Sequence, residues 1–164
     1  MRTLYLLRHA KSSWKDVSLR DFDRPLKDRG RKAAKRMGQY LADEKLKGLL
    51  VVCSPAVRTR ETADIFFKSA ELDVEVRFEE RIYEASLRDL MQVVLELPDK
   101  EKVAILIGHN PGFEELLAYL TGEFRRVPTC ALAKIKLEDV SWKDIREDAG
   151  SLQWFVTPNE LEEE

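Results

Sequence analysis

The amino-acid sequence predicts an α/β fold built on a largely parallel sheet, and three short apolar runs are the main evidence. Residues 4–7, 49–53 and 103–107 contain only apolar side chains. Unbroken runs of this length are typical of strands that are buried on both faces, as in parallel sheets. Segments with helical periodicity separate the runs, so we expect helices to cover the sheet.

Two amphipathic helices follow from the spacing of apolar residues. The first is expected to begin at about Asp28, because the apolar residues of this segment recur at helical spacing. These residues are Ala33, Ala34, Met37 and Leu41. Lys47 and Gly48 are expected to end this helix. A second helix is expected over residues 86–97, where the apolar residues share one face, before Pro98 breaks it.

Two further helices are expected directly after apolar runs. Ser54 precedes Pro55 at the end of the second run, which is the pattern of an N-cap followed by the first helical residue. Arg58 is then expected at the end of the first turn. Asn110 and Pro111 repeat the pattern after the third run and predict another helix start there.

The remaining predicted strands alternate apolar and polar residues. Residues 74–78 are expected to form a half-exposed strand near an edge of the sheet. Residues 131–137 and 152–156 are joined by a short polar connector, so we expect an antiparallel pair that extends the sheet. From Pro158 we expect a short surface element.

Length and composition indicate a globular protein. The chain has 164 residues, and we expect a single domain over residues 1–164. Hydrophobic residues make up 44% and charged residues 35%, and the net charge of −2 gives no global field for nucleic acid or an anionic membrane. The two cysteines form no C-x-x-C motif, and no apolar stretch approaches membrane-spanning length. We therefore expect a cytoplasmic protein.

Basic residues are concentrated between residues 20 and 36. They are Arg20, Arg24, Lys27, Arg29, Arg31, Lys32, Lys35 and Arg36. A solvated helix face is one explanation of this run. A positive rim that attracts an anionic substrate is the other.

Reactive or cationic residues follow each of the three apolar runs. Arg8 and His9 follow the first run. Arg58 lies in the helix after the second run, and His109 follows the third. In a parallel sheet these ends share one edge, toward which helix N-termini direct free N–H groups. Two arginines and two histidines there would form a site for a dianionic tetrahedral group, most simply phosphate, and a histidine can carry a phosphoryl group covalently.

Other chemistries fit the sequence less well. A zinc site needs three or four ligands at compatible spacing, whereas His9, Cys53, His109 and Cys130 are scattered singly. The phosphate-binding motifs G-x-x-x-x-G-K-[ST] and G-x-G-x-x-G are absent, as is the nucleophile elbow G-x-S-x-G. The paired arginines and histidines therefore carry the functional prediction.

The ordered motifs resemble those of the histidine phosphatase superfamily, also called the phosphoglycerate mutase-like family. They read R-H-A at residues 8–10, S-P-A-V-R at 54–58 and G-H at 108–109. More narrowly, the chain resembles SixA-type phosphohistidine phosphatases, the compact branch with minimal insertions. L-R-H-A-K, D-R-P-L, I-Y-E-A-S and G-H-N-P support this, and they occur in this order along most of the chain.

The resemblance implies a three-layer α/β/α sandwich with a mostly parallel central sheet, and a phosphatase that needs no metal ion and no cofactor. It implies that His9 is the nucleophile that receives the phosphoryl group. Arg8, Arg58 and His109 would form the phosphate pocket, with His109 also supporting the transition state. Ser12, in the polar segment after His9, is a further expected substrate-binding residue. The implied partner is a phosphorylated protein that bears phosphohistidine, or a small phosphorylated molecule.

The sequence offers more than one candidate for the proton donor. Glu80 occupies the position of the usual superfamily acid, with Glu84 close behind, so Glu80 is our candidate for a third catalytic residue. SixA-type enzymes are described as having a weak or absent acid, which suits a labile P–N bond whose leaving group is an imidazole. The alternative role of Glu80 is a surface carboxylate paired with Arg81.

Three functions are therefore weighed. The leading prediction is a phosphatase that hydrolyses phosphohistidine in a protein through a phosphorylated His9. The alternative keeps this chemistry and changes the substrate to a small phosphoester or nucleotide. The third is a non-catalytic phosphate-binding module, against which the complete set of arginines and histidines argues.

Overall fold

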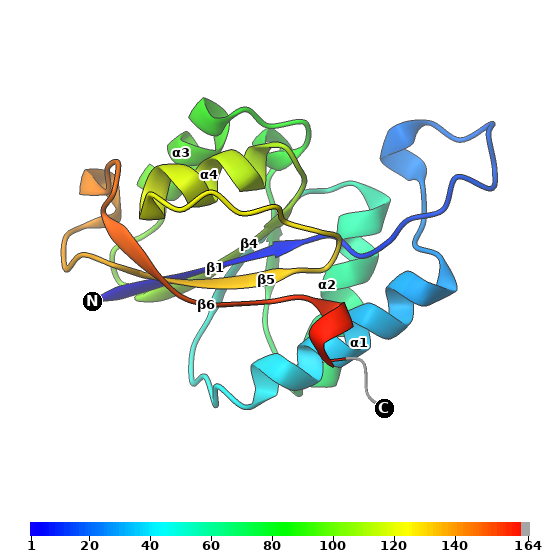
Figure 1. Cartoon of the computed structure of the whole chain (residues 1–164), viewed down its shortest axis with the longest axis horizontal. Coiled ribbons are helices and arrows are strands. Elements are labelled where there is room, and N and C mark those ends of the chain that lie inside the picture. The colour runs from blue at the N-terminus through cyan, green and yellow to red at the C-terminus, as the bar shows by residue number, and fades with distance from the viewer. Residues whose placement is uncertain (162–164) are drawn as a thin grey trace.

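The computed structural model describes residues 1–161 and contains one six-stranded sheet with helices on both faces (Figure 1). The strand order is β3-β2-β4-β1-β5-β6. The strands are β1 (Arg2–Arg8), β2 (Leu50–Cys53), β3 (Val76–Phe78), β4 (Val103–Gly108), β5 (Leu132–Leu137) and β6 (Gly150–Val156). Strands β1 to β4 are parallel, and β5 is antiparallel to both β1 and β6. The predicted α/β fold with a mostly parallel sheet is confirmed.

Four α-helices of the described residues form the outer layers. They are α1 (Asp28–Ala42), α2 (Val57–Ala70), α3 (Leu87–Leu95) and α4 (Gly112–Thr121). Helices α1 and α2 cover one face of the sheet, and α3 and α4 cover the other, which gives the expected three-layer α/β/α sandwich (Figure 1). None of the helices within residues 1–161 has the length and apolarity needed to cross a membrane.

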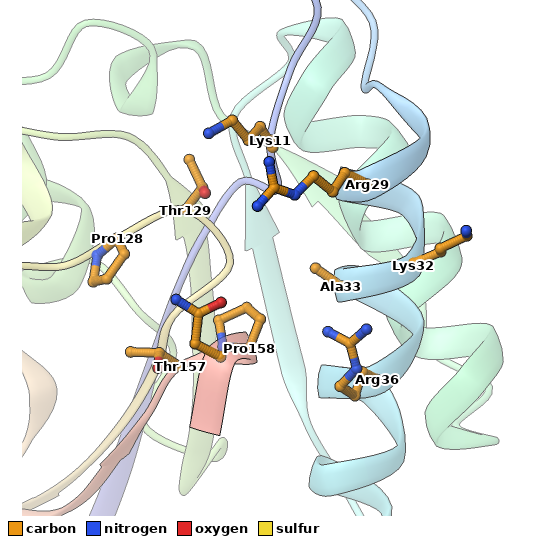
Figure 2. A pocket seen from close by; sticks show the side chains of 10 residues that line it. Lys11, Arg29, Lys32, Ala33, Arg36, Pro128, Thr129, Thr157 and Pro158 are labelled. Atoms are coloured by element: carbon orange, nitrogen blue, oxygen red, sulfur yellow. The ribbon is translucent and has the colours of Figure 1, made fainter. Parts of the chain in front are cut away.

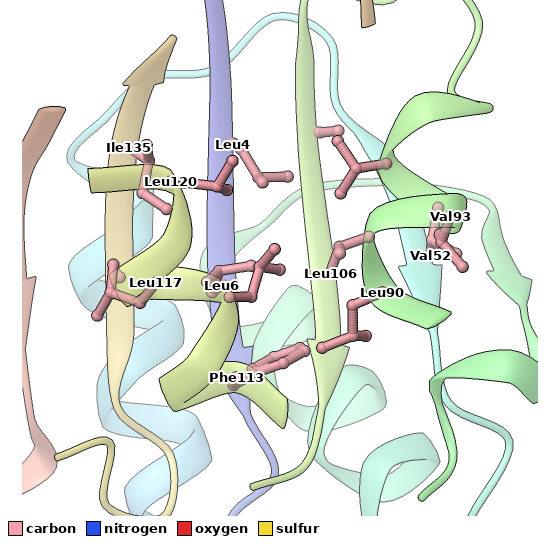
Figure 3. Packing of buried hydrophobic residues seen from close by; sticks show 14 of the residues in the cluster. Leu4, Leu6, Val52, Leu90, Val93, Leu106, Phe113, Leu117, Leu120 and Ile135 are labelled. Atoms are coloured by element: carbon pink, nitrogen blue, oxygen red, sulfur yellow. The ribbon is translucent and has the colours of Figure 1, made fainter. Parts of the chain in front are cut away.

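Strand β1 shows why the central runs contain no polar residue. Leu4 and Leu6 pack in the core beneath α3 and α4, as Figure 3 shows, whereas Tyr5 and Leu7 pack in the core beneath α1 and α2. Successive side chains of a strand point to opposite faces of the sheet. Because both faces are covered, every position of the strand meets an apolar environment.

The prediction that Ser54 caps α2 is wrong. The helix begins at Val57, and Ala56 is its N-cap residue. The Ser54 N–H donates to the carbonyl oxygen of Ile107 at 2.9 Å, so Ser54 still belongs to the hydrogen-bonded sheet edge. Its side chain is turned toward His109 and not toward the helix. Arg58 is consequently the second helical residue and does not lie at the end of the first turn.

The prediction that Asn110 caps α4 is also wrong, because its side chain has other partners. The N-cap residue is Pro111. The Asn110 side-chain amide donates to the Val127 carbonyl at 2.8 Å and to a carboxylate oxygen of Glu114 at 3.0 Å. Helix α4 ends at Thr121, and Gly122 follows it in a left-handed conformation at φ 76°.

Three other boundaries bear on the predictions. Helix α1 ends at Ala42, before the expected Lys47 and Gly48, because the chain turns through Lys45 with φ 52°. The predicted edge strand is β3, at one end of the sheet, and the predicted antiparallel pair is β5 with β6. The expected surface element is a 3-10 helix over Pro158–Leu161, and residues 162–164 lie outside the described part of the chain.

Candidate active site

The ends of β1 and β4 place the two histidines of the chain side by side. The strands are parallel neighbours, and Arg8 is in register with Gly108. The His9 N–H donates to the carbonyl oxygen of Gly108 at 3.0 Å. Each histidine directly follows its strand, so the ring centroids of His9 and His109 lie 5.3 Å apart. Strand register alone therefore brings together two residues that are a hundred positions apart in the chain.

Gly108 is needed at the end of β4 because the space around it is filled. A Cβ atom at this position would lie 2.7 Å from a methyl group of Ile82 and 2.8 Å from the ring of Phe113. Both neighbours are fully buried, so neither can move aside without disturbing the core. The glycine thus allows close packing directly beneath His109.

Strand β2 contributes Ser54 from the other side of β4. The side chain of Ser54 is fully buried, and its Oγ lies 2.7 Å from Nε2 of His109. The same oxygen accepts a hydrogen bond from the Ala56 N–H at 3.3 Å, which leaves the Ser54 hydroxyl proton free to be donated to Nε2. In that arrangement the proton of the neutral His109 ring resides on Nδ1.

A hydrogen bond to the adjacent backbone carbonyl orients the ring of His9. Nδ1 of His9 lies 2.7 Å from the carbonyl oxygen of Ala10, and a carbonyl can only accept, so Nδ1 carries the proton. The unprotonated Nε2 then holds the lone pair of the ring. The Ala10 N–H donates to Oγ1 of Thr62, which in turn donates to the Arg58 carbonyl at 2.6 Å. This chain of hydrogen bonds ties the segment after β1 to helix α2.

Both imidazoles are held in their neutral form. Burial lowers the pKa of His9 to about 3, with His109, Arg8 and Arg58 adding to the effect and only the Ala10 carbonyl opposing it. Burial likewise lowers the pKa of His109 to about 3, and Arg58 and Arg8 act in the same direction. Since the charged form of each ring is disfavoured, both rings are neutral near pH 7.

The two arginines are anchored at their outer nitrogens. Arg8 donates from Nη1 to the Val127 carbonyl at 3.0 Å. Arg58 donates from Nη1 to the Asp21 carbonyl at 2.8 Å and from Nη2 to an Asp21 carboxylate oxygen at 3.0 Å. Burial lowers the pKa of Arg8, and the neighbouring positive charge of Arg58 adds to this effect, while Glu114 opposes it. The arrangement concentrates two positive charges beside two neutral imidazoles.

Asp21 links Arg58 to the loop between β1 and α1, and sequence reasoning did not identify it. Its carboxylate accepts hydrogen bonds from Arg58, from Arg24 at 3.2 Å and from the Tyr83 hydroxyl at 2.6 Å. Burial alone would raise the pKa of Asp21, but Tyr83 and Arg58 outweigh it and hold the pKa at about 2. The only sequence signal nearby was the D-R-P-L motif that contains Arg24.

These residues surround a pocket of about 320 Å³. Its lining includes Arg8, His9, Ser12, Arg24, Arg58 and His109. Within residues 1–161, four buried side-chain nitrogen or oxygen atoms lack a hydrogen-bond partner, and all four belong to residues of this lining. They are Nε of Arg8, Nε of Arg58, Nδ1 of His109 and Oδ1 of Asn110. Three of them are nitrogens that can donate to an anion.

Five of the six predicted site residues lie in this pocket, and Glu80 does not. Ser12 is held at the rim by Arg24, whose Nη1 donates to its Oγ at 2.8 Å. Glu80 begins a 3-10 helix over Glu80–Ile82, is exposed, and is not part of the lining. The expected surface pair with Arg81 is made by Glu79, at 2.9 Å.

The described residues contain no cluster of side chains that could hold a metal ion. No group of three or more His, Cys, Asp or Glu side chains within residues 1–161 lies close enough together to hold a metal ion. The two cysteines are buried and unpaired, and burial raises the pKa of each thiol to about 12. Neither thiol is therefore a nucleophile near neutral pH.

Comparisons with known proteins agree with this geometry. A family model described as the histidine phosphatase superfamily (branch 1) matches residues 4–111. The uncharacterized chloroplastic protein At3g52155 of Arabidopsis thaliana is 32% identical over 93% of this chain and 74% of its own length. The structure of a SixA protein from Nakamurella multipartitia superimposes with a TM-score of 0.83 and 26% identity, covering 96% of each chain. The protein histidine phosphatase SixA complexed with tungstate shares the fold, with a TM-score of 0.84 and 20% identity, over 98% of this chain and 99% of that one.

Proposed function

Since the chain belongs to branch 1 of the histidine phosphatase superfamily and is of the SixA type, we propose that this phosphatase hydrolyses phosphohistidine in a protein. The proposed reaction passes through a covalent intermediate in which Nε2 of His9 carries the phosphoryl group. It is proposed to need no metal ion and no cofactor.

One observation carries the proposal. Nε of Arg8, Nε of Arg58 and Nδ1 of His109 are buried donors without a partner among residues 1–161, and they belong to residues that line the same pocket as His9. A transferring phosphoryl group has three equatorial oxygens, each of which accepts hydrogen bonds. Three buried donors beside a ring nitrogen with a free lone pair match those oxygens in number and in charge.

In the first step the Nε2 lone pair of His9 attacks phosphorus and a new P–N bond forms. The P–N bond of the substrate breaks, and its electron pair stays on the departing imidazole nitrogen. If the other nitrogen of that imidazole is protonated, the leaving group departs as neutral imidazole. Nδ1–H of phosphorylated His9 remains bound to the Ala10 carbonyl, which stabilises the positive charge on the ring.

In the second step water attacks phosphorus, its oxygen bonds to phosphorus, and the P–Nε2 bond breaks. The electron pair of that bond returns to Nε2 of His9. The water proton passes to the product phosphate or to solvent, so His9 is again neutral. Arg8 and Arg58 stabilise the transferring group electrostatically in both steps.

The position of Glu80 supports a P–N substrate over an ester. An alkoxide leaving group needs protonation by a nearby acid, whereas an imidazole leaves without one. Glu80 is exposed and outside the pocket lining. Asp21, whose carboxylate contacts Arg58 of the pocket, is held ionised with a pKa of about 2 and has no proton to give near neutral pH.

The rim of the pocket supports a protein substrate. Trp14 belongs to the lining and is 71% exposed, with the Arg24 guanidinium 3.5 Å from its ring centroid. Val17 and Leu19, in the same loop, are 93% and 38% exposed. A loop that lines the pocket and carries exposed apolar side chains offers contact surface to a macromolecule.

The proposal is tested with a protein that carries ³²P-labelled phosphohistidine. Rapid mixing and alkaline quenching should trap the label on the enzyme, at His9, before inorganic phosphate is released. His9→Ala should show neither labelling nor turnover, and EDTA should leave the wild-type rate unchanged. Full phosphatase activity in His9→Ala contradicts the covalent mechanism.

A small phosphoester is the second candidate substrate, because a pocket of about 320 Å³ also admits one. The rates for the phosphohistidine protein and for a panel of sugar, amino-acid and nucleotide phosphates separate the two. Glu80→Gln adds a second criterion. If Glu80 serves as acid for esters, this variant slows ester hydrolysis far more than P–N hydrolysis.

A further inference from the structure

A second hollow lies beside the active-site pocket, and we call it the basic cleft. Its volume is about 450 Å³. Its lining includes Lys11, Arg29, Lys32, Arg36, Thr129 and Pro158. Helix α1 forms one wall, and the loop before β5 and the chain after β6 form the other (Figure 2).

The cleft is positively charged. Among residues 1–161, four cations and no carboxylate belong to its lining. Within residues 1–161, none of the four forms an ion pair, whereas Arg31 of the same helix pairs with Asp28 at 2.7 Å. Because the whole chain has a net charge of −2, this excess is local. Such a surface attracts an anionic partner.

The cations are spread along the cleft. Arg29, Lys32 and Arg36 follow one another on one face of α1, and seven residues of helix span about 10 Å. Figure 2 shows Lys11 and Arg29 at the end near Thr129, Arg36 further along the helix, and Lys32 pointing away from the cavity. A single phosphate group needs convergent donors, whereas this spacing suits several anions at intervals.

The cleft and the active-site pocket share a wall. Lys11 and Thr129 belong to the lining of both. Lys11 is two residues from His9. Helix α1 is fixed against this segment at Gly30, where a Cβ atom would lie 2.2 Å from the Lys11 carbonyl oxygen. A molecule with its phosphoryl group at His9 can therefore extend past Lys11 into the basic cleft.

We propose that the basic cleft binds carboxylate side chains of the phosphoprotein substrate, in an extended segment next to its phosphohistidine. The proposal rests on the proposed function and names the substrate class more closely. Side chains on one side of an extended chain recur about every 7 Å, so two or three of them match the span of about 10 Å from Arg29 to Arg36. Alternate acidic side chains of such a segment lie on one side, so they can face the row of cations together.

The test compares two phosphohistidine peptides, one with aspartates flanking the phosphohistidine and one with serines in their place. Wild-type protein should hydrolyse the acidic peptide with a kcat/KM roughly fivefold higher, since each partly exposed ion pair contributes modestly. Arg29→Gln/Arg36→Gln should abolish this preference, mainly through KM. Phosphoramidate, which is too small to reach the cleft, should be hydrolysed at a rate within twofold of wild type, because neither arginine lines the active-site pocket.

The matched control is Arg31→Gln/Lys35→Gln, which removes the same charge from the same helix outside the cleft. This variant should keep the preference for the acidic peptide. Equal kcat/KM for both peptides in wild type, or equal loss of preference in both double variants, overturns the proposal. A sugar bisphosphate that loses affinity in Arg29→Gln/Arg36→Gln, while the acidic peptide does not, would instead assign the cleft to a second phosphate.

Failure of the basic cleft to bind acidic side chains can be distinguished from failure of the proposed function. If no phosphohistidine peptide is hydrolysed, the same acidic and neutral sequences carrying phosphoserine test the cleft on an ester. If neither is hydrolysed, fluorescence anisotropy with the unphosphorylated acidic peptide tests it by binding. Binding that is weakened by Arg29→Gln/Arg36→Gln and not by the control supports the cleft in either case, and binding equal in all three proteins overturns it.

Discussion

The Oγ of Ser54 lies 2.7 Å from Nε2 of His109, and this contact joins the ends of strands β2 and β4. Ser54 is fully buried and touches no open part of the pocket. It therefore acts on the proposed phosphate site through the histidine. By donating to Nε2, the serine keeps the ring proton on Nδ1, the atom that has no partner in the described part of the chain.

Ser54→Ala should lower kcat for phosphohistidine hydrolysis about tenfold, because the ring of His109 loses the bond that fixes its tautomer and orientation. KM should change by less than about twofold, since the arginines are untouched. Steady-state kinetics measure both constants. Ser69→Ala is the matched control, because that hydroxyl is exposed and bonds only to the Lys35 carbonyl. Equal kinetics in the two variants would contradict a positioning role.

Asp21→Asn should lower kcat/KM by about tenfold, because Arg58 loses a charged partner that holds its guanidinium in place. A second readout is the ionisation of Tyr83. Burial and the hydrogen bond to Asp21 raise the pKa of Tyr83 to about 12, so the variant should lower this pKa toward the ordinary value of 10.0. Ultraviolet titration, with Tyr83→Phe to identify the signal, measures it. Asp23→Asn, which removes a carboxylate paired only with Arg20, should leave both readouts unchanged.

Stability should fall as the pH drops below about 6.5 and His9 and His109 begin to bind protons in the unfolded chain. Burial lowers the pKa of each in the folded protein to about 3, so the unfolded state binds more protons between these values and the free energy of unfolding rises with pH. Each histidine contributes at most about 1.4 kcal/mol per pH unit to the slope. Urea unfolding at intervals from pH 5 to 7.5 measures it.

The chain has two histidines, so the variant His109→Gln leaves only His9 and isolates the effect of His109. The slope of the free energy of unfolding against pH, measured from pH 5 to 7.5, should be smaller than that of wild type by the equivalent of up to one bound proton. An unchanged slope would show that His109 is not held neutral in the folded state. Carboxylates such as Asp21, with its pKa of about 2, act at lower pH, where their stabilising contribution is lost as they are protonated.

Gly30→Ala should destabilise the protein by about 1–3 kcal/mol, because the added methyl group would meet the Lys11 carbonyl oxygen at 2.2 Å and push α1 away from that segment. Urea unfolding gives the change in free energy. The matched control is Gly48→Ala, where a Cβ atom meets nothing within 4 Å. If both substitutions have the same small effect, the close approach of α1 to Lys11 is not required for stability.

The parts of the site that depend on strand register could be predicted from the sequence. Arg8, His9 and His109 each end an unbroken apolar run, and such runs identify strands whose ends share an edge. Arg58 could be added because a helix had to follow the second run. These four residues could be predicted without knowledge of any side-chain contact, because the unbroken apolar runs identify the strands.

The parts that depend on loop conformation could not be predicted. Asp21 lies in a segment without periodicity, so nothing in the sequence indicates that it meets Arg58 and Tyr83. Ser54 and Asn110 were expected to cap helices, because their residue types favour that role. In the structure their side chains bond to His109, Val127 and Glu114 instead. The capping preferences of these residue types placed polar side chains correctly at the strand ends, but the hydrogen-bond partners that they predicted were wrong.

The register between β1 and β4 has a consequence for how this protein can diverge. The positions of the two histidines are fixed by backbone hydrogen bonds between the central strands. The surrounding residues Trp14 and Thr129 lie on loops, and Arg29 lies on a face of α1. Substitutions at the periphery leave the register of the strands intact. Under the proposed function, the reacting atoms depend on the strand register and substrate recognition on the surrounding surfaces, so a substitution can alter recognition while the reacting atoms keep their places.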